Sequence, residues 1–130
     1  MSIGVVCIGC GFIGARHLAN LATLGGVRIV AVADSDEARA REQGQRYGAR
    51  SYTDWQAMLA QEHPDAAYIC LPPFARGEPE LALTAAGIPF FAEKPLAATA
   101  EVPERIAEAV AAARLLTSVG YHWRYLDTIE

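Results

Sequence analysis

The sequence lacks the features that mark nucleic-acid-binding and membrane-spanning proteins. Its 11 lysines and arginines are outnumbered by 15 aspartates and glutamates, which leaves a net charge of −4, and no two basic residues are adjacent. We expect no nucleic-acid partner, because phosphate binding needs a concentrated basic surface. The apolar run Ile3–Ile8 is far shorter than the roughly 20 residues that span a bilayer, and no secretory signal frames it. We therefore expect no membrane partner and a cytoplasmic location.

Cysteine is also scarce, with three residues in the chain. Cys7 and Cys10 form a C-x-x-C pair, a spacing found in zinc sites and redox dithiols. A zinc site needs about four ligands, and beyond Cys70 the sequence offers no His-x-x-x-His partner. Because Cys7 falls within an apolar, strand-like run, we interpret it as a small buried hydrophobe and expect no metal.

Repeats, low-complexity tracts and linkers are absent, and short apolar runs alternate with segments of helical spacing. At 130 residues, 52% hydrophobic and 20% charged, the chain suits a globular domain with a real core. Nearly continuous apolarity is typical of strands that are covered on both faces. The expected strands are Ile3–Ile8, Val27–Ala33, Arg50–Tyr52, Ala66–Leu71, Ile88–Ala92 and Leu115–Val119. Alternation with helices predicts an α/β fold, a doubly wound parallel sheet of the Rossmann type with strand order 3-2-1-4-5-6.

A glycine-rich segment, G-C-G-F-I-G at residues 9–14, directly follows the first expected strand and opens a helix. In that context the pattern predicts a dinucleotide-binding turn. Gly9 permits the tight turn, Gly11 lets the backbone approach a pyrophosphate, and Gly14 allows close helix–strand packing. The phosphates would face free N–H groups at the positive end of the helix dipole, beside Phe12 and Ile13.

An acidic residue, Asp34, ends the second expected strand, 20 residues after Gly14. A carboxylate there accepts hydrogen bonds from the ribose hydroxyls of the adenosine and repels a 2′-phosphate, which predicts NAD over NADP. The alternative is that Asp34 only caps the helix near Glu37, a role that Ser35 or Asp36 could fill instead. Arg39 lies close enough to stack on adenine or to soften this selectivity.

The stretch A-E-K-P-L-A at residues 92–97 narrows the class of enzyme. It follows the fifth expected strand, and ligands bind at the carboxyl ends of parallel strands, so Lys94 should stand near the nicotinamide. Its ammonium could hydrogen-bond a reacting oxygen and stabilise developing negative charge, with Glu93 orienting it and Pro95 shaping the loop. The alternative is a solvated lysine in a turn.

With these features together the chain resembles the glucose–fructose oxidoreductase/inositol dehydrogenase (Gfo/Idh/MocA) family. The resemblance covers essentially all of the chain. It rests on G-C-G-F-I-G-A-R-H at 9–17, A-V-A-D at 31–34, Y-I-C-L-P-P at 68–73, A-G-I-P-F-F-A-E-K-P at 86–95 and G-Y-H-W-R-Y at 120–125. The family implies an N-terminal Rossmann domain followed by a larger substrate domain, and hydride transfer between a nicotinamide cofactor and a sugar, inositol or other polyol.

The resemblance also assigns residues. It implies that the glycine turn and Asp34 bind NAD, that Lys94 positions cofactor and substrate, and that the loop after the fourth strand lines the cofactor. The residues carried over for the loop and the nicotinamide end are Leu71, Pro72, Pro73, Glu93, Lys94 and Arg124. His17 matches a frequent family histidine, for which we expect a structural role.

Two residues depart from the family pattern. Arg76 replaces a histidine that usually stands four residues after the first proline of the loop, and His122 replaces an asparagine. Both changes are expected at the rim between cofactor and substrate, so the substrate class could differ from the common sugars.

The domain reading is that residues 1–120 form the NAD(P)-binding domain and residues 121–130 begin a crossover toward a substrate domain. The base that takes the hydroxyl proton would then come from that second domain, with His122 a less favoured substitute. Tyr125, Leu126 and Ile129 look like the start of an amphipathic helix. Apolar surface that would face the second domain makes a homodimer a further expectation.

Two other functions remain as alternatives to an oxidoreductase domain. One is a non-catalytic NAD(H)-binding or redox-sensing module, and the other, less favoured, is a methyltransferase that uses S-adenosylmethionine.

Overall fold

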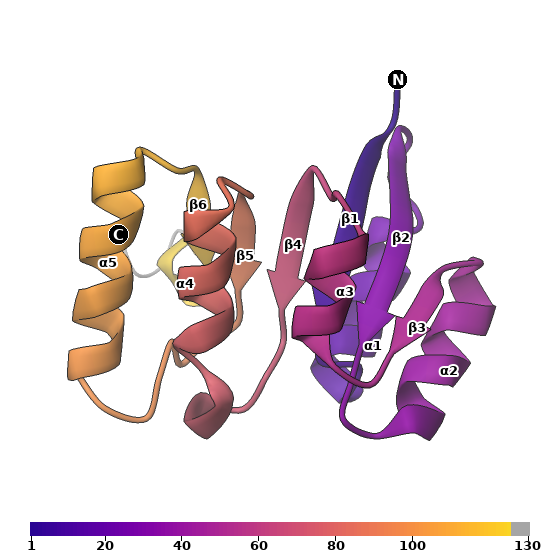
Figure 1. Cartoon of the computed structure of the whole chain (residues 1–130), viewed down its shortest axis with the longest axis horizontal. Coiled ribbons are helices and arrows are strands. Elements are labelled where there is room, and N and C mark those ends of the chain that lie inside the picture. The colour runs from indigo at the N-terminus through magenta and orange to yellow at the C-terminus, as the bar shows by residue number, and fades with distance from the viewer. Residues whose placement is uncertain (126–130) are drawn as a thin grey trace.

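The computed structural model describes residues 1–125, which form a six-stranded parallel sheet flanked by helices (Figure 1). The strands are β1 (Ile3–Ile8), β2 (Val27–Ala33), β3 (Arg50–Tyr52), β4 (Ala66–Ile69), β5 (Phe90–Ala92) and β6 (Thr117–Val119). The helices are α1 (Phe12–Leu21), α2 (Glu37–Tyr47), α3 (Trp55–Gln61), α4 (Glu78–Ala85) and α5 (Glu101–Ala113), with 3-10 turns at Pro73–Ala75 and His122–Tyr125. The expectations for Leu126 and Ile129 lie outside the described residues.

The strand order is β3-β2-β1-β4-β5-β6, as the sequence predicts, and every neighbouring pair is parallel. Three strands are shorter than predicted. In β5 the reason is Pro89, which has no N–H to donate to the sheet, while the N–H of Ile88 bonds to Leu83 at the end of α4. Helix α4 itself is one that the spacing did not single out.

The core has two parts, one on each face of the sheet. On one face, Met58 of α3, Leu83 of α4 and Ile106 of α5 pack against buried residues of β1, β2, β4 and β5. On the other, Leu18 and Leu21 of α1 pack against Val5, Cys7 and Val32. Right-handed crossovers account for this division. Helices α1 and α2 lead from β1 to β2 and from β2 to β3, toward one edge of the sheet, and so lie on one face. Helices α3, α4 and α5 lead to β4, β5 and β6, toward the other edge, and so lie on the opposite face. In Figure 1, α3 and α4 lie in front of the sheet and α1 lies behind it.

On the α1 side, the sheet is covered unevenly. Helix α1 contacts β1, β2 and β4, whereas Tyr68 of β4 and Phe91 of β5 are only half-buried. A cleft therefore lies beside α1, over β5 and β6.

As for membrane insertion, none of the helices within residues 1–125 is long and apolar enough to span a bilayer.

Candidate functional site

The glycine turn joins β1 to α1, and two of its three glycines are required by packing. Gly9 has φ +96°, and a Cβ there would lie 2.6 Å from the carbonyl oxygen of Cys70. A Cβ on Gly14 would lie 1.9 Å from the carbonyl oxygen of Gly9, so helix and turn touch backbone to backbone. Both positions match the tight turn and the close packing that the sequence predicts.

Gly11 is different, because a Cβ there would meet no atom within 4 Å. Its φ is −66°, a conformation that other residues adopt freely, so neither strain nor crowding in the described structure explains a glycine here. The open space lies at the N-terminus of α1. A side chain at this position would occupy the approach of a ligand to the backbone.

The N-terminus of α1 is suited to an anion. Gly11 is the N-cap, no side chain of the described residues caps the helix, and its first turn holds no acidic residue. The first amides of a helix have no partner within it, and the helix dipole adds partial positive charge. Phe12 is 81% exposed, and Ile13 lines the cleft beside α1. Uncapped N–H groups at a helix N-terminus are the kind of groups that bind phosphate.

Asp34 stands at the end of β2, directly beside the glycine turn. Its Oδ2 accepts a hydrogen bond from the N–H of Cys10 at 2.8 Å, and its Oδ1 accepts one from the N–H of Asp36 at 2.8 Å. The N-cap of α2 is instead Asp36, which accepts from the N–H groups of Ala38 and Arg39. The capping alternative for Asp34 is thus filled by its neighbour. The half-exposed Arg39 guanidinium lies 3.4 Å from Asp34 and 3.5 Å from Asp36.

The loop after β4 carries Leu71, Pro72 and Pro73, which are partly or fully exposed at the carboxyl edge of the sheet. Arg76, by contrast, does not lie at the rim where the sequence places it. Its side chain is 0% exposed, and it pairs with Glu80, also 0% exposed, at 2.9 Å.

The Arg76 guanidinium ties two loops together beneath the site. It donates to the carbonyl oxygen of Ile69, where β4 ends, and to that of Glu93, where β5 ends. Burial lowers the pKa of Arg76, and the Glu80 carboxylate opposes that effect. Glu80 also accepts the N–H of Gly77 at 2.7 Å. In this chain, position 76 therefore belongs to a buried ion pair.

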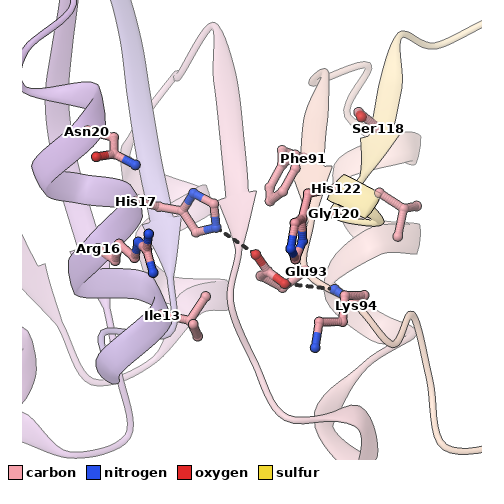
Figure 2. A pocket seen from close by; sticks show the side chains of 11 residues that line it. Ile13, Arg16, His17, Asn20, Phe91, Glu93, Lys94, Ser118, Gly120 and His122 are labelled. Atoms are coloured by element: carbon pink, nitrogen blue, oxygen red, sulfur yellow. Dashed lines mark hydrogen bonds and ion pairs between the residues drawn. The ribbon is translucent and has the colours of Figure 1, made fainter. Parts of the chain in front are cut away.

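Glu93 is the first residue after β5, and its side chain points toward α1 (Figure 2). Its Oε1 is 2.7 Å from Nε2 of His17, and its Oε2 accepts the backbone N–H of Lys94 at 3.0 Å. Glu93 thus contacts Lys94 through the lysine backbone: Figure 2 draws this bond to the main chain, and the ammonium points elsewhere. His17 was not placed at the site by sequence reasoning. The available signal was its position three residues after Gly14, on the helix face that turns toward the sheet.

The cleft beside α1 encloses about 480 Å³. Its lining includes His17, Glu93, Lys94 and His122, so it brings together groups from α1, from the loop after β5 and from the segment after β6. A second hollow, of about 410 Å³, contains Lys94 and Arg124. Lys94 stands between the two, and the structure places both His122 and Arg124 near it.

The three cysteines lie in or beside the glycine turn as free thiols. Cys7 and Cys10 are buried, and Cys70 is partly exposed. A hydrogen bond with the Cys70 thiol and burial raise the pKa of Cys7 well above 9.0. Burial and the nearby Asp34 carboxylate raise the pKa of Cys10 to about 12. Within residues 1–125, no group of three or more His, Cys, Asp and Glu side chains is placed to hold a metal ion.

Residues 3–121 match the family model GFO_IDH_MocA, described as an oxidoreductase family with an NAD-binding Rossmann fold. The chain belongs to this family. Among curated relatives, inositol 2-dehydrogenase 2 of Saccharopolyspora erythraea is 38% identical over 128 residues, which cover 96% of this chain and 37% of the relative.

Solved structures show the same architecture. Myo-inositol 2-dehydrogenase from Lactobacillus plantarum superposes with a TM-score of 0.90 at 25% identity, covering 98% of this chain and 38% of the other. The WlbA dehydrogenase from Bordetella pertussis, in complex with NADH and UDP-GlcNAcA, superposes with a TM-score of 0.91 at 25% identity, covering 99% and 40%. The chain thus spans less than half the length of the family members that it matches, and corresponds to their NAD-binding Rossmann domain.

Proposed function

We propose that this chain binds NAD in preference to NADP and forms the cofactor half of an oxidoreductase that acts on an inositol or a similar polyol. The observation that carries the cofactor proposal is Gly11, the one glycine of the turn whose Cβ would meet open space. A glycine that packing does not require, placed at an uncapped helix N-terminus, is explained by a ligand that approaches the backbone.

The preference for NAD rests on the place of Asp34. Its carboxylate is held beside the glycine turn by the N–H groups of Cys10 and Asp36. Carboxylate oxygens there would accept the ribose hydroxyls of the adenosine and repel a phosphate at the 2′ position. Arg39 is partly neutralised by Asp34 and Asp36, which leaves less positive charge for a 2′-phosphate.

The role proposed for Lys94 follows from its place at the carboxyl end of β5. Bound NAD would supply the hydride acceptor, and the polyol would lose a hydride from carbon to NAD and a proton from its hydroxyl to a base of the substrate domain. The Lys94 ammonium, at the junction of both hollows, would hydrogen-bond the reacting oxygen and stabilise its developing charge. Arg124 borders the same hollow. The polyol class is supported by the inositol dehydrogenases among the relatives.

The decisive experiment is a titration of the chain with NADH and with NADPH, followed by nicotinamide fluorescence and calorimetry. We expect saturable binding that favours NADH. Gly11→Ala should weaken NADH binding by at least about tenfold, because a methyl group would occupy the phosphate approach. Its melting temperature should not fall, since the added Cβ meets nothing and φ is permissive.

Gly25→Ala is the matched control. Gly25 lies after α1, its Cβ would also meet nothing within 4 Å, and its φ is not in the positive region. NADH affinity in this variant should equal that of the parent chain. Equal affinities for the Gly11 and Gly25 variants would remove the glycine turn from cofactor binding, and binding of neither nucleotide by the parent chain would refute the proposal.

A further inference from the structure

The His17–Glu93 hydrogen bond joins two parts of the chain that are 76 residues apart. His17 lies in the second turn of α1, the helix that begins at the glycine turn, and Glu93 follows β5. Figure 2 shows the two side chains pointing toward each other across the cleft wall, with Lys94 on the far side of Glu93. The bond therefore links α1 to the loop that carries Lys94, on the face of the sheet that α1 covers.

Both partners are confined. His17 and Glu93 are 22% and 18% exposed, and the imidazole ring packs on Tyr68 and Phe91 at centroid distances of 5.4 Å and 5.0 Å. Behind the carboxylate is Gly120, where a Cβ would approach both Glu93 oxygens at 3.2 Å. With a ring on one side and backbone on the other, the carboxylate has little freedom to rotate.

The orientation of Glu93 reaches Lys94 directly. One carboxylate oxygen is occupied by His17 and the other by the N–H of Lys94. Lys94 itself is exposed and lies in a loop, so this bond and that of Arg76 to the Glu93 carbonyl hold the main chain from which the ammonium extends. Without the imidazole, the carboxylate could turn away from the Lys94 amide.

We infer that His17 is a positioning residue for Lys94, acting through Glu93. It links the helix that meets the cofactor phosphates to the loop that meets the nicotinamide end, so that the two halves of the site keep a fixed relation. The inference rests on the proposed function for its ligand but concerns a residue to which that proposal assigns no role. A displacement of a positioned group by as little as about 1 Å can greatly weaken its action.

The first test uses no ligand. Hydrogen exchange of the Lys94 amide, followed by NMR, is compared in the parent chain, His17→Phe and His17→Gln. Phenylalanine keeps the ring packing on Tyr68 and Phe91 but cannot bond the carboxylate, whereas the glutamine amide can donate to it. We expect Lys94 exchange to be at least about tenfold faster in His17→Phe and close to the parent rate in His17→Gln. Unchanged exchange in His17→Phe would overturn the inference.

The second test separates positioning from a purely structural role. NADH and ADP share the adenosine and the two phosphates, but only NADH has the nicotinamide half that would reach Lys94 under the proposed function. His17→Phe should weaken NADH binding by about tenfold and ADP binding by less than about twofold. Equal losses for both ligands, or a loss that follows a drop in melting temperature, would assign His17 to the stability of the fold and contradict the inference.

His63→Ala is the control for removal of a histidine, because His63 is exposed at the amino-terminal end of β4, away from the carboxyl edge. It should change neither Lys94 exchange nor the two affinities. If the parent chain binds neither ADP nor NADH, the proposed function fails, yet the exchange test still decides whether His17 holds the Lys94 main chain. The two failures are therefore distinguishable.

Discussion

Asp34 is hydrogen-bonded to the glycine turn: its Oδ2 accepts the backbone N–H of Cys10 at 2.8 Å. The other oxygen accepts the N–H of Asp36, at the start of α2. One carboxylate thus joins the ends of β1 and β2 while presenting negative charge at the carboxyl edge of the sheet. Substitution by alanine would remove the charge and also leave two N–H groups without their acceptor, so its effects on binding and on stability would be mixed.

Asp34→Asn separates these effects. The asparagine oxygen still accepts one of the two N–H groups, but the negative charge is lost, and with it the repulsion of a 2′-phosphate. We expect the ratio of the NADPH to the NADH dissociation constant to fall by about tenfold. Asp65→Asn is the matched control, since it removes one carboxylate charge that accepts the N–H of Gly4, at the opposite, amino-terminal edge of the sheet, and should leave the ratio unchanged. Calorimetric titration of both variants with both nucleotides measures it, and an unaltered ratio in Asp34→Asn would exclude a selective role.

The buried Arg76–Glu80 pair gives a second prediction. Removing one partner leaves the other as an uncompensated buried charge, so Arg76→Met or Glu80→Leu alone should cost about 3–5 kcal/mol of unfolding free energy. The double variant should lose less than the sum of the single losses. Urea unfolding followed by circular dichroism measures all three.

The control for this prediction is Arg41→Ala, which breaks the exposed Arg41–Glu37 pair of the same i,i+4 spacing. Exposed pairs contribute little, so its unfolding free energy should hardly change. If Arg76→Met were as mild as Arg41→Ala, the buried pair would not be what joins the two loops.

The thiols give a prediction about alkaline pH. Because folding raises the pKa of Cys10 from 9.0 to about 12 and that of Cys7 upward, the folded state favours the protonated thiols. Their contribution to stability is complete below pH 9 and is lost as the pH rises from 9 toward 12. The melting temperature should fall over this interval, and less steeply in Cys10→Ala. If the melting temperature of Cys10→Ala fell with pH as steeply as that of the parent chain, the raised pKa of Cys10 would be contradicted.

The same shift predicts thiol reactivity. At pH 8, iodoacetamide should modify the partly exposed Cys70 before Cys7 and Cys10, because alkylation needs an accessible thiolate. Mass spectrometry of the digested protein identifies the labelled position. Labelling of Cys10 as fast as in urea-unfolded chain would show that its thiol is neither buried nor protonated as described.

Local pattern was enough to predict the strand order and the glycine turn. Apolar runs, helical spacing and the handedness of crossovers act over short segments, so the order β3-β2-β1-β4-β5-β6 follows from them. Gly9 and Gly14 were predicted for the same reason, since their roles depend on the adjoining strand and helix. The start of β5 was less well predicted, because Pro89 and the last turn of α4 compete for that segment.

The sequence by itself determined the fold class, the glycine turn and the place of Asp34 at the end of β2. Only the tertiary structure decided what Arg76 and His17 do. Arg76 looked like a substitution at the substrate rim and is instead buried against Glu80, and His17 meets Glu93 from 76 residues away. Such pairs depend on how β4, β5 and α1 come together in space, and no periodicity in the chain encodes which side chains then meet.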